Sequence, residues 1–311
     1  RNYLFRIFLT LAALALLLGY ALAAPEAGVK EPFEQGVAAL TQGNPSLAVE
    51  KFTAVIKIDP KLPEAYINRG IAEMQLSLWG DAVGDFDQAL ELNPRSPQAF
   101  YNRGLAYSRN GEFAKAVADY TRAAKFAPKD WQIYYNRGNA YLDMKKAKEA
   151  LKDYNQALKL HPGAPEILHN RSLAYLALDK PEPALADADK VIELKPDYAR
   201  AYYSRGQALE KLGHKYEALA AYRHFLKTGD PDADVIKTYV QIGMGVGIVA
   251  GVAADAQRDG LVVLPCGHLF GRNVTRLAVK EGTYLRGFVY SFIELLVPGW
   301  DKRRVEEAFR G

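Results

Sequence analysis

Five prolines recur 34 residues apart in the middle of this chain of 311 residues, and this period constrains the fold more than any other feature. They are Pro60, Pro94, Pro128, Pro162 and Pro196. An arginine ladder keeps the same period: Arg69, Arg103, Arg137, Arg171 and Arg205. A fixed period of this length indicates one structural unit copied along the chain, and such arrays typically build an extended binding surface.

Counting back from the prolines divides the middle of the chain into six units, namely 29–62, 63–96, 97–130, 131–164, 165–198 and 199–232. Position 8 of each unit holds a small residue: Gly36, Gly70, Gly104, Gly138, Ser172 and Gly206. Position 24 is aromatic in five units: Phe52, Phe86, Tyr120, Tyr154 and Tyr222. Small residues let two helices approach closely, and an aromatic ring fills the space beside them. Each periodic proline is expected to end a helix, because it lacks the backbone donor.

This pattern resembles the tetratricopeptide repeat family, whose unit of about 34 residues folds as two antiparallel helices. The resemblance covers residues 29–232. It implies an all-α fold, a right-handed α-solenoid of six helix hairpins that share one continuous core. It also implies that the first helix of each hairpin lines a concave groove that binds another protein or peptide.

Positions 5 and 6 of the units are expected to face this groove. An asparagine row at position 6 resembles the ladder in the repeats of O-linked sugar transferases, which hold a client by its main chain. An asparagine can bond both groups of a peptide, because it carries a donor and an acceptor. Alternatively, the asparagines bond the neighbouring helix or water, and the tyrosines pack between repeats. The candidate partner-binding residues are Asn68, Asn102, Asn136, Asn170, Tyr101, Tyr135, His169 and Tyr203.

The arginine at position 7 is unusual, because the resemblance implies an apolar residue there. Position 23 offers an aspartate in four units: Asp85, Asp119, Asp153 and Asp187. An arginine could pair with the aspartate of its own unit or with that of the preceding unit, and the sequence leaves both open. Either arrangement predicts structural ion pairs, in which removing one partner would cost about 3 kcal/mol.

The N-terminal segment is positively charged and then apolar. Arg1 and Arg6 precede an apolar run that begins at Ile7, and a small-x-small pattern follows at Ala21-Leu22-Ala23. Residues 1–24 are therefore interpreted as a secretory signal peptide or as a membrane anchor helix, and 25–28 as a linker. Both interpretations predict an extracytoplasmic, periplasmic-side location for the repeats, either membrane-anchored or secreted.

Residues 233–311 break the period and resemble no family that we recognise. A capping helix is expected first, followed by a glycine-rich apolar region. Gly243, Gly247 and Gly251 are four residues apart, which would place them on one helix face in close contact with another helix. A helix buried within this protein or a partner, membrane insertion, and a loop or strand remain alternatives for this stretch.

The chemistry of the chain predicts a protein that is not an enzyme and needs no cofactor. Its net charge is only +4 with both signs interspersed, so no nucleic-acid partner is expected. The single cysteine, Cys266, has only His268 close by as a second ligand, whereas a metal site needs three or four. We therefore expect no catalytic and no metal-binding residue.

Three functional hypotheses follow. The first is a non-catalytic scaffold that holds a peptide or subunit for assembly or stabilisation of an envelope or membrane complex. The second is a permanent structural subunit of a membrane protein complex, anchored by its N-terminal helix and C-terminal region. The third is an enzyme whose active site lies in residues 233–311.

Overall fold

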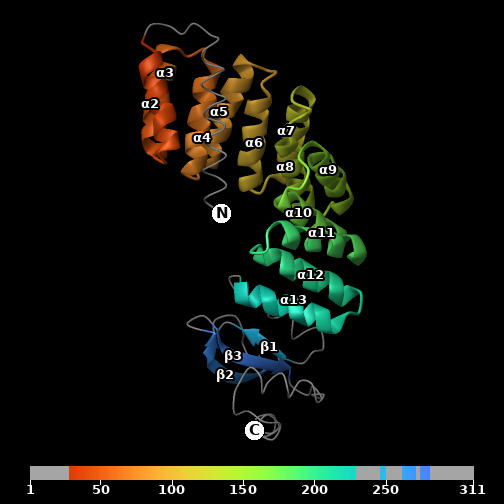
Figure 1. Cartoon of the computed structure of the whole chain (residues 1–311). Helices are drawn as coiled ribbons and strands as arrows, with labels where there is room; N and C mark the ends of the chain where they lie inside the picture. Colours follow the sequence, from red (N-terminus) through yellow and green to blue (C-terminus); the bar gives the residue numbers. More distant parts are fainter. Residues whose placement is uncertain (1–27, 229–245, 250–260, 271–273, 281–311) are drawn as a thin grey trace, which may run out of the picture. The chain divides into compact units, whose positions relative to one another are not determined.

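The structure is a computed structural model that describes residues 28–228, 246–249, 261–270 and 274–280. In these residues, twelve helices form six hairpins (Figure 1). The first helices of the hairpins are α2 (Lys30–Thr41), α4 (Pro63–Gln75), α6 (Pro97–Arg109), α8 (Trp131–Asp143), α10 (Pro165–Ala177) and α12 (Ala199–Lys211). The second helices are α3 (Pro45–Ile58), α5 (Trp79–Leu92), α7 (Phe113–Phe126), α9 (Ala147–Leu160), α11 (Pro181–Leu194) and α13 (Lys215–Thr228).

Proline and capping residues set the helix boundaries. Several helices begin with proline at the first turn, where a missing N–H costs nothing, and Ser96 caps α6 by accepting from the backbone N–H of Ala99. Helices α3 to α11 of the second set end two residues before a periodic proline, as the sequence predicts. The carbonyl of Pro60, Pro128 or Pro196 then accepts a hydrogen bond from a tyrosine of the next hairpin, as in Tyr134 Oη to Pro128 O at 3.1 Å. The periodic proline thus ends one hairpin and helps to orient the next.

The turn inside each hairpin has the same backbone conformation. Position 15 has a positive φ in all six units, and glycine occupies it at Gly43, Gly111 and Gly213. In the other three units the residue is Ser77, Lys145 or Asp179, with φ between 56 and 62°. A residue with a side chain is strained in this left-handed region, so the fold imposes this turn even where the residue does not favour it.

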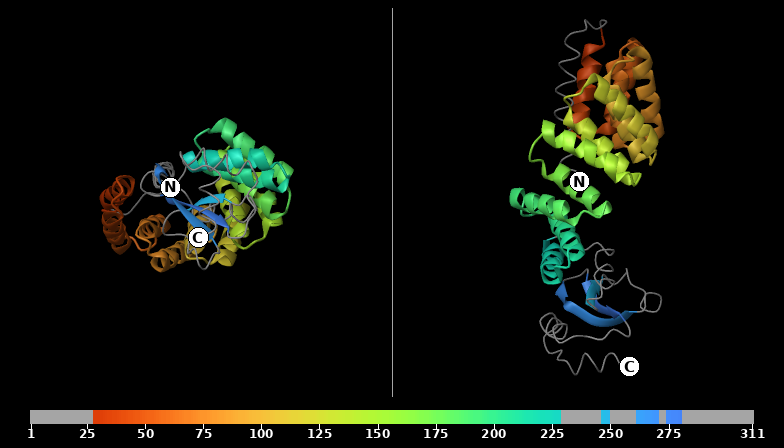
Figure 2. Two further views of the ribbon diagram at one scale, coloured as in Figure 1. Left: turned by 90° about the horizontal axis from the view of Figure 1, so that it is seen from below. Right: turned by 90° about the vertical axis from the view of Figure 1, so that its right-hand side faces the viewer.

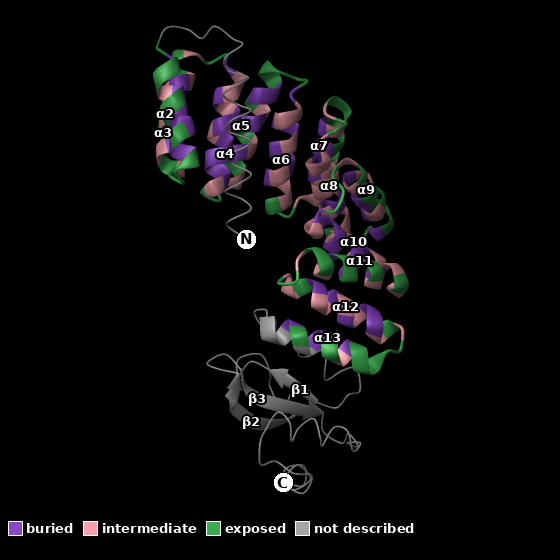
Figure 3. Ribbon diagram, in the orientation of Figure 1, coloured by how far each residue is buried: buried purple, intermediate pink, exposed green. Residues whose placement is uncertain are grey.

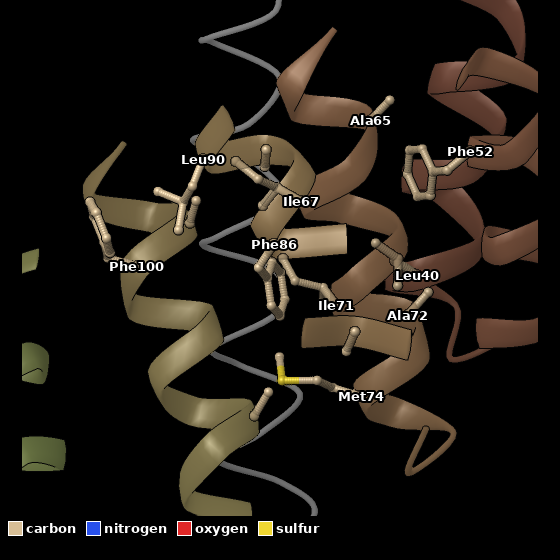
Figure 4. Close-up of a cluster of buried hydrophobic side chains, with 14 of the residues drawn as sticks. Leu40, Phe52, Ala65, Ile67, Ile71, Ala72, Met74, Phe86, Leu90 and Phe100 are labelled. Carbon is tan, nitrogen blue, oxygen red and sulfur yellow. The ribbon is translucent and has the colours of Figure 1, made fainter. Parts of the chain in front are cut away.

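In the core of the first four hairpins a glycine faces an aromatic ring. A Cβ added to Gly104 would lie 2.8 Å from the ring of Tyr120, and one on Gly138 would lie 2.7 Å from Tyr154. In the fifth unit both partners change together, because Ser172 replaces the glycine and Ala188 replaces the aromatic residue. Buried residues line the facing sides of the stacked helices, and Phe86 lies beside Ile71 in this core (Figures 3 and 4).

Hairpins stack in chain order, each second helix packing on the first helix of the next unit (Figure 2). The first helices of neighbouring units also contact each other more extensively than the second helices do. In a curved stack the side with the closer spacing is the inner side. The first helices therefore form the inner side of the array, as the family resemblance implies, and the predicted all-α repeat solenoid is confirmed.

The C-terminal residues that the structure describes form a three-stranded antiparallel sheet, with strand order β1-β3-β2. Its strands are β1 (Val246–Val249), β2 (Leu261–Phe270) and β3 (Val274–Lys280). Gly247 lies in β1 opposite Ala278, so its predicted place on a helix face is wrong. Its neighbours in sequence include β-branched valine and isoleucine, which favour a pleated strand over a helix.

Gly243, Gly251 and the N-terminal segment 1–24 lie outside the described residues. Within the part of the chain that the structure describes, none of the helices combines the length and apolar character needed to cross a bilayer.

Candidate functional site

The predicted groove residues lie on the inner side of the array, which we call the first-helix face. The structure divides them by exposure. Asn68 is fully buried, and Asn102 and His169 are 8% and 6% exposed, so these three side chains serve packing between helices. The other five are partly exposed on this face: Tyr101, Tyr135, Asn136, Asn170 and Tyr203. A contact between a bound chain and Asn68, Asn102 or His169 is therefore not supported by their positions.

Positions 5 and 6 are joined by hydrogen bonds between successive repeats. The amide nitrogen of Asn136 donates to the hydroxyl of Tyr101, Nδ2 to Oη, over 2.9 Å. Asn170 Nδ2 donates in the same way to Tyr135 Oη at 3.2 Å. At the next junction Ser204 and His169 take the same two positions, with Oγ and Nδ1 3.4 Å apart. The sequence positions of each pair differ by 35 residues, and only stacking brings them together.

The asparagine amides also bond the backbone. The Nδ2 of Asn68, Asn102 and Asn136 donates to the carbonyl four residues earlier, at 2.9 to 3.0 Å. An amide oxygen could not take this place, because it would face another acceptor. The alternative in which the asparagines bond the neighbouring helix holds for Asn136 and Asn170, whereas Asn68 and Asn102 bond a carbonyl of their own helix.

Asn139 is a site residue that the sequence did not single out. Its Oδ1 accepts from Tyr154 Oη and from Asn170 Nδ2, both at 2.8 Å. With Tyr135, these side chains make a polar network between the fourth and fifth repeats. An asparagine at position 9, which is apolar in four of the other units, was the available signal.

Burial controls the ionisation of the groups on this face. Burial raises the pKa of Tyr101 and of Tyr135 above the usual value, so both hydroxyls stay protonated at neutral pH. Burial, aided by the positive charge of Arg200, lowers the pKa of His169 to about 4, and the imidazole is neutral. These tyrosine, asparagine and histidine side chains are therefore uncharged and present hydrogen-bonding groups rather than charge.

Four of the five ladder arginines pair with an aspartate of their own repeat. The Nε and Nη2 of Arg69, Arg103, Arg137 and Arg171 each donate to the position-23 aspartate of the same unit at 2.7 Å. The remaining Nη1 reaches the preceding repeat, but at position 25, where Arg137 meets Thr121 at 3.1 Å and Arg171 meets Asn155 at 2.7 Å. Each of these four arginines therefore joins the two helices of its own hairpin and the hairpin before it, whereas Arg205 donates from Nε to Asp189 at position 25 of the preceding repeat at 2.6 Å.

Glu73 departs from this pattern in the second repeat. It stands at position 11, where the next three repeats have tyrosine, and it is 8% exposed. Its Oε1 lies 4.0 Å from Arg69 Nε, but that guanidinium already donates to Asp85 and Thr53, and Glu73 Oε2 has no hydrogen-bond partner among the described residues. Burial and the charge of Asp85 raise the pKa of Glu73 to about 7, despite the opposing charge of Arg69.

Comparison with protein families agrees with this architecture. Tetratricopeptide repeat models match residues 33–97, 67–130, 131–163 and 169–234, together more than half of the chain. The chain belongs to the tetratricopeptide repeat family. Its array is a protein–protein interaction scaffold, a fold that is generally not catalytic.

Solved structures share this fold at low sequence identity. The crystal structure of YrrB, described as a TPR protein with an unusual peptide-binding site, is 22% identical with a TM-score of 0.54, and the match covers 60% of this chain and 96% of YrrB. A tetratricopeptide repeat protein from Parabacteroides merdae is 16% identical with a TM-score of 0.60, over 91% of this chain and 97% of its own. MamA from Desulfovibrio magneticus RS-1 is 23% identical with a TM-score of 0.53, over 56% of this chain and 99% of its own.

Curated relatives of a different protein class match a segment of about 80 residues. The HTH-type transcriptional regulator CysB of Burkholderia cenocepacia is 56% identical over 81 residues, 26% of each chain. The HTH-type transcriptional regulator SsuR of the same organism is 46% identical over 80 residues, 25% of this chain and 26% of that one. The chain thus spans about a quarter of the length of these relatives.

Proposed function

We propose that this protein is a non-catalytic scaffold that holds an extended segment of another polypeptide on its first-helix face. The row of partly exposed, uncharged tyrosine and asparagine side chains in the third to fifth repeats carries this proposal. Rigid aromatic side chains are effective binding anchors, because they bury much area at little conformational cost. Main-chain hydrogen bonding demands little of the client's sequence.

We place this activity on the periplasmic side, where the scaffold assists assembly or stabilisation of an envelope or membrane complex. The charged and apolar residues 1–24 support that location. A permanent subunit of a membrane complex is the alternative within the same class. Copurification through detergent in fixed stoichiometry, dependent on residues 1–24, would favour the subunit over the scaffold.

The test of the scaffold uses a permanently unfolded client, reduced and carboxymethylated α-lactalbumin. The full chain should bind it, and the combined change of Tyr135, Asn136 and Asn170 to alanine should abolish binding while circular dichroism stays unchanged. Asn155→Ala is the matched control, because Asn155 is exposed on the second helix α9, away from the first-helix face. Retained binding in the triple variant would reject the proposal.

A second candidate function rests on the curated relatives. Their match of 79 to 82 residues is too long for the segment before the repeat models and is close in length to residues 235–311, which follow them. We assign the match to this C-terminal region, which would then contribute to regulating transcription. That role requires a cytoplasmic location.

A C-terminal fusion to alkaline phosphatase, an enzyme that is active only outside the cytoplasm, separates the two candidate functions. Phosphatase activity of the fusion supports the scaffold. An inactive phosphatase fusion, together with a C-terminal fluorescent-protein fusion that fluoresces in the cytoplasm, supports the regulator.

A further inference from the structure

The asparagines that remain exposed on the first-helix face have no free donor. Asn136 has two amide hydrogens, and its Nδ2 bonds two acceptors, Tyr101 Oη at 2.9 Å and Gln132 O at 3.0 Å. Asn170 Nδ2 likewise bonds Tyr135 Oη at 3.2 Å and Asn139 Oδ1 at 2.8 Å. Only the two Oδ1 atoms remain open, and neither is among the buried unbonded atoms of the described residues. The resemblance implied that one asparagine bonds both groups of a peptide. Neither Asn136 nor Asn170 can do so by itself, because neither has a free donor.

The tyrosine of each pair has the complementary free group. Tyr101 accepts a hydrogen bond from Asn136, and Tyr135 accepts one from Asn170. Asn139 also bonds Tyr135, and because its Oδ1 already accepts two hydrogen bonds, its amide nitrogen is the donor there. These bonds use the oxygen of each phenol and leave its proton for another acceptor. A phenol can donate and accept at once. Each junction therefore carries one open acceptor, the asparagine oxygen, and one open donor, the tyrosine hydroxyl.

We propose that the pairs Tyr101–Asn136 and Tyr135–Asn170 are two composite subsites, each of which binds one peptide group of an extended client. The asparagine Oδ1 accepts the client N–H, and the tyrosine hydroxyl donates to the client carbonyl. This inference rests on the proposed scaffold function and names the chemistry of its partner: an extended chain with free backbone N–H groups.

The spacing of the subsites suits an extended chain. First helices of neighbouring repeats are in contact, so their axes lie about 8–10 Å apart. An extended chain rises about 3.3 Å per residue, and about three residues therefore separate the two bound peptide groups. The remaining junctions lack the pair. Phe33 and Ile67 stand at position 5 in the first two repeats, and His169 at the last junction is buried. The binding segment is thus limited to the third, fourth and fifth repeats.

The test compares two fluorescent probes of twelve residues, one alternating alanine and threonine and the other all proline. Both are extended and both have carbonyl groups, but oligoproline has no backbone N–H. The full chain should bind the alanine–threonine probe about 25-fold more tightly, because oligoproline loses the N–H bond at both subsites and each lost hydrogen bond weakens binding about fivefold. Equal or tighter binding of oligoproline would overturn the inference.

A variant pair isolates the tyrosine donors. Tyr101→Phe with Tyr135→Phe keeps both rings in place, removes one donor from each subsite and should weaken alanine–threonine binding about 25-fold. Tyr134→Phe is the matched control, because the hydroxyl of Tyr134 donates to Pro128 O and lies outside the two composite subsites. The affinity of this variant for the alanine–threonine probe should stay at the wild-type value. An unchanged affinity in the double variant, or an equal loss in the control, contradicts the inference. If α-lactalbumin still binds in either case, the scaffold function stands and only the composite subsites are rejected. If no unfolded probe binds the wild-type chain, both are rejected.

Discussion

The front section of the array, residues 29–96, and its rear section, residues 131–198, share one backbone design but differ in the chemistry that joins successive repeats. In the front section, position 5 is apolar and buried, with Phe33 and Ile67 in a continuous hydrophobic core. In the rear section, Tyr135 and His169 stand at this position and bond the next repeat. The comparison shows that a helical repeat can stack through dry packing or through a polar network without changing its turns or helix lengths.

The two sections also treat the arginine ladder differently. Tyr175 in the rear section lies beside Arg171, with the guanidinium carbon 5.9 Å from the ring centre. In the front section, Glu73 occupies the equivalent position beside Arg69, and its Oε2 has no donor in the part of the chain that the structure describes. At position 11 a buried carboxyl group thus replaces a cation–π contact, although Arg69 keeps another such contact with Tyr66, and this difference gives the two sections different responses to mutation and pH.

The largest expected difference follows from removing an aspartate of the ladder. Asp153→Ala in the rear section leaves Arg137 without its carboxylate and should cost about 3–5 kcal/mol of stability. Asp85→Ala in the front section should cost clearly less, because Glu73 can ionise and pair with Arg69. Urea unfolding of both variants measures the two losses. Equal losses would show that Glu73 does not act as a second carboxylate.

The packing of glycine against an aromatic ring gives the next largest effect. Gly138→Ala places a Cβ against Tyr154, whose ring lies 2.7 Å from that site, and should destabilise the chain by about 2 kcal/mol. Gly70→Ala in the front section meets Phe86 at 2.8 Å and should cost the same. Ser172→Ala serves as the control, because no ring opposes it. If Gly138→Ala melts at the wild-type temperature, the close approach is not essential.

The pH dependence of local stability should have opposite signs in the two sections. The pKa of Glu73 is raised to about 7, so the front section holds its proton more tightly than the unfolded chain and loses stability as pH rises from about 4.5 to 7. The pKa of His169 is lowered to about 4, so the rear section loses stability as pH falls from about 6.5 to 4. Each change should reach about 1–2 kcal/mol.

Amide hydrogen exchange, corrected for intrinsic rates, measures both slopes in one sample. Glu73→Gln should flatten only the slope of the front section, and His169→Gln only that of the rear section. Asp81, Asp85 and Arg69 act on Glu73, and Arg200 acts on His169, and these charges remain in both variants. Parallel slopes in the two sections would contradict the assignment.

The smallest effect should be the same in both sections, because it concerns the backbone alone. Ser77→Gly and Lys145→Gly relieve a positive φ of 62° and 60° at equivalent turns. Each should stabilise the chain by about 0.5 kcal/mol, since the relief of strain is partly offset by the freedom of glycine in the unfolded chain. Thermal unfolding of both variants checks this. A gain in one section only would show that its turn is held by side-chain contacts.

The sequence alone determined the repeat, the hairpins and their close packing. These features depend on local chemistry within one unit: proline ends a helix, and a small residue at position 8 lets the second helix of the hairpin approach closely. It also identified the arginine and aspartate partners as residue types. The sequence could not show whether each arginine pairs with the aspartate of its own repeat or with that of the preceding repeat, because both arrangements bring the same opposite charges together.

Tertiary structure decided the rest, because the remaining contacts join residues that are far apart in sequence. Asn136 donates a hydrogen bond to Tyr101, which lies 35 residues earlier in the sequence. This bond occupies the amide donor that the sequence analysis expected to bind a client peptide. Gly247 lies in a strand because β3, nearly thirty residues later, pairs with it, and a four-residue glycine spacing contains no information about that partner. Local patterns specify which elements form, whereas the satisfaction of each polar group depends on what stacking places beside it.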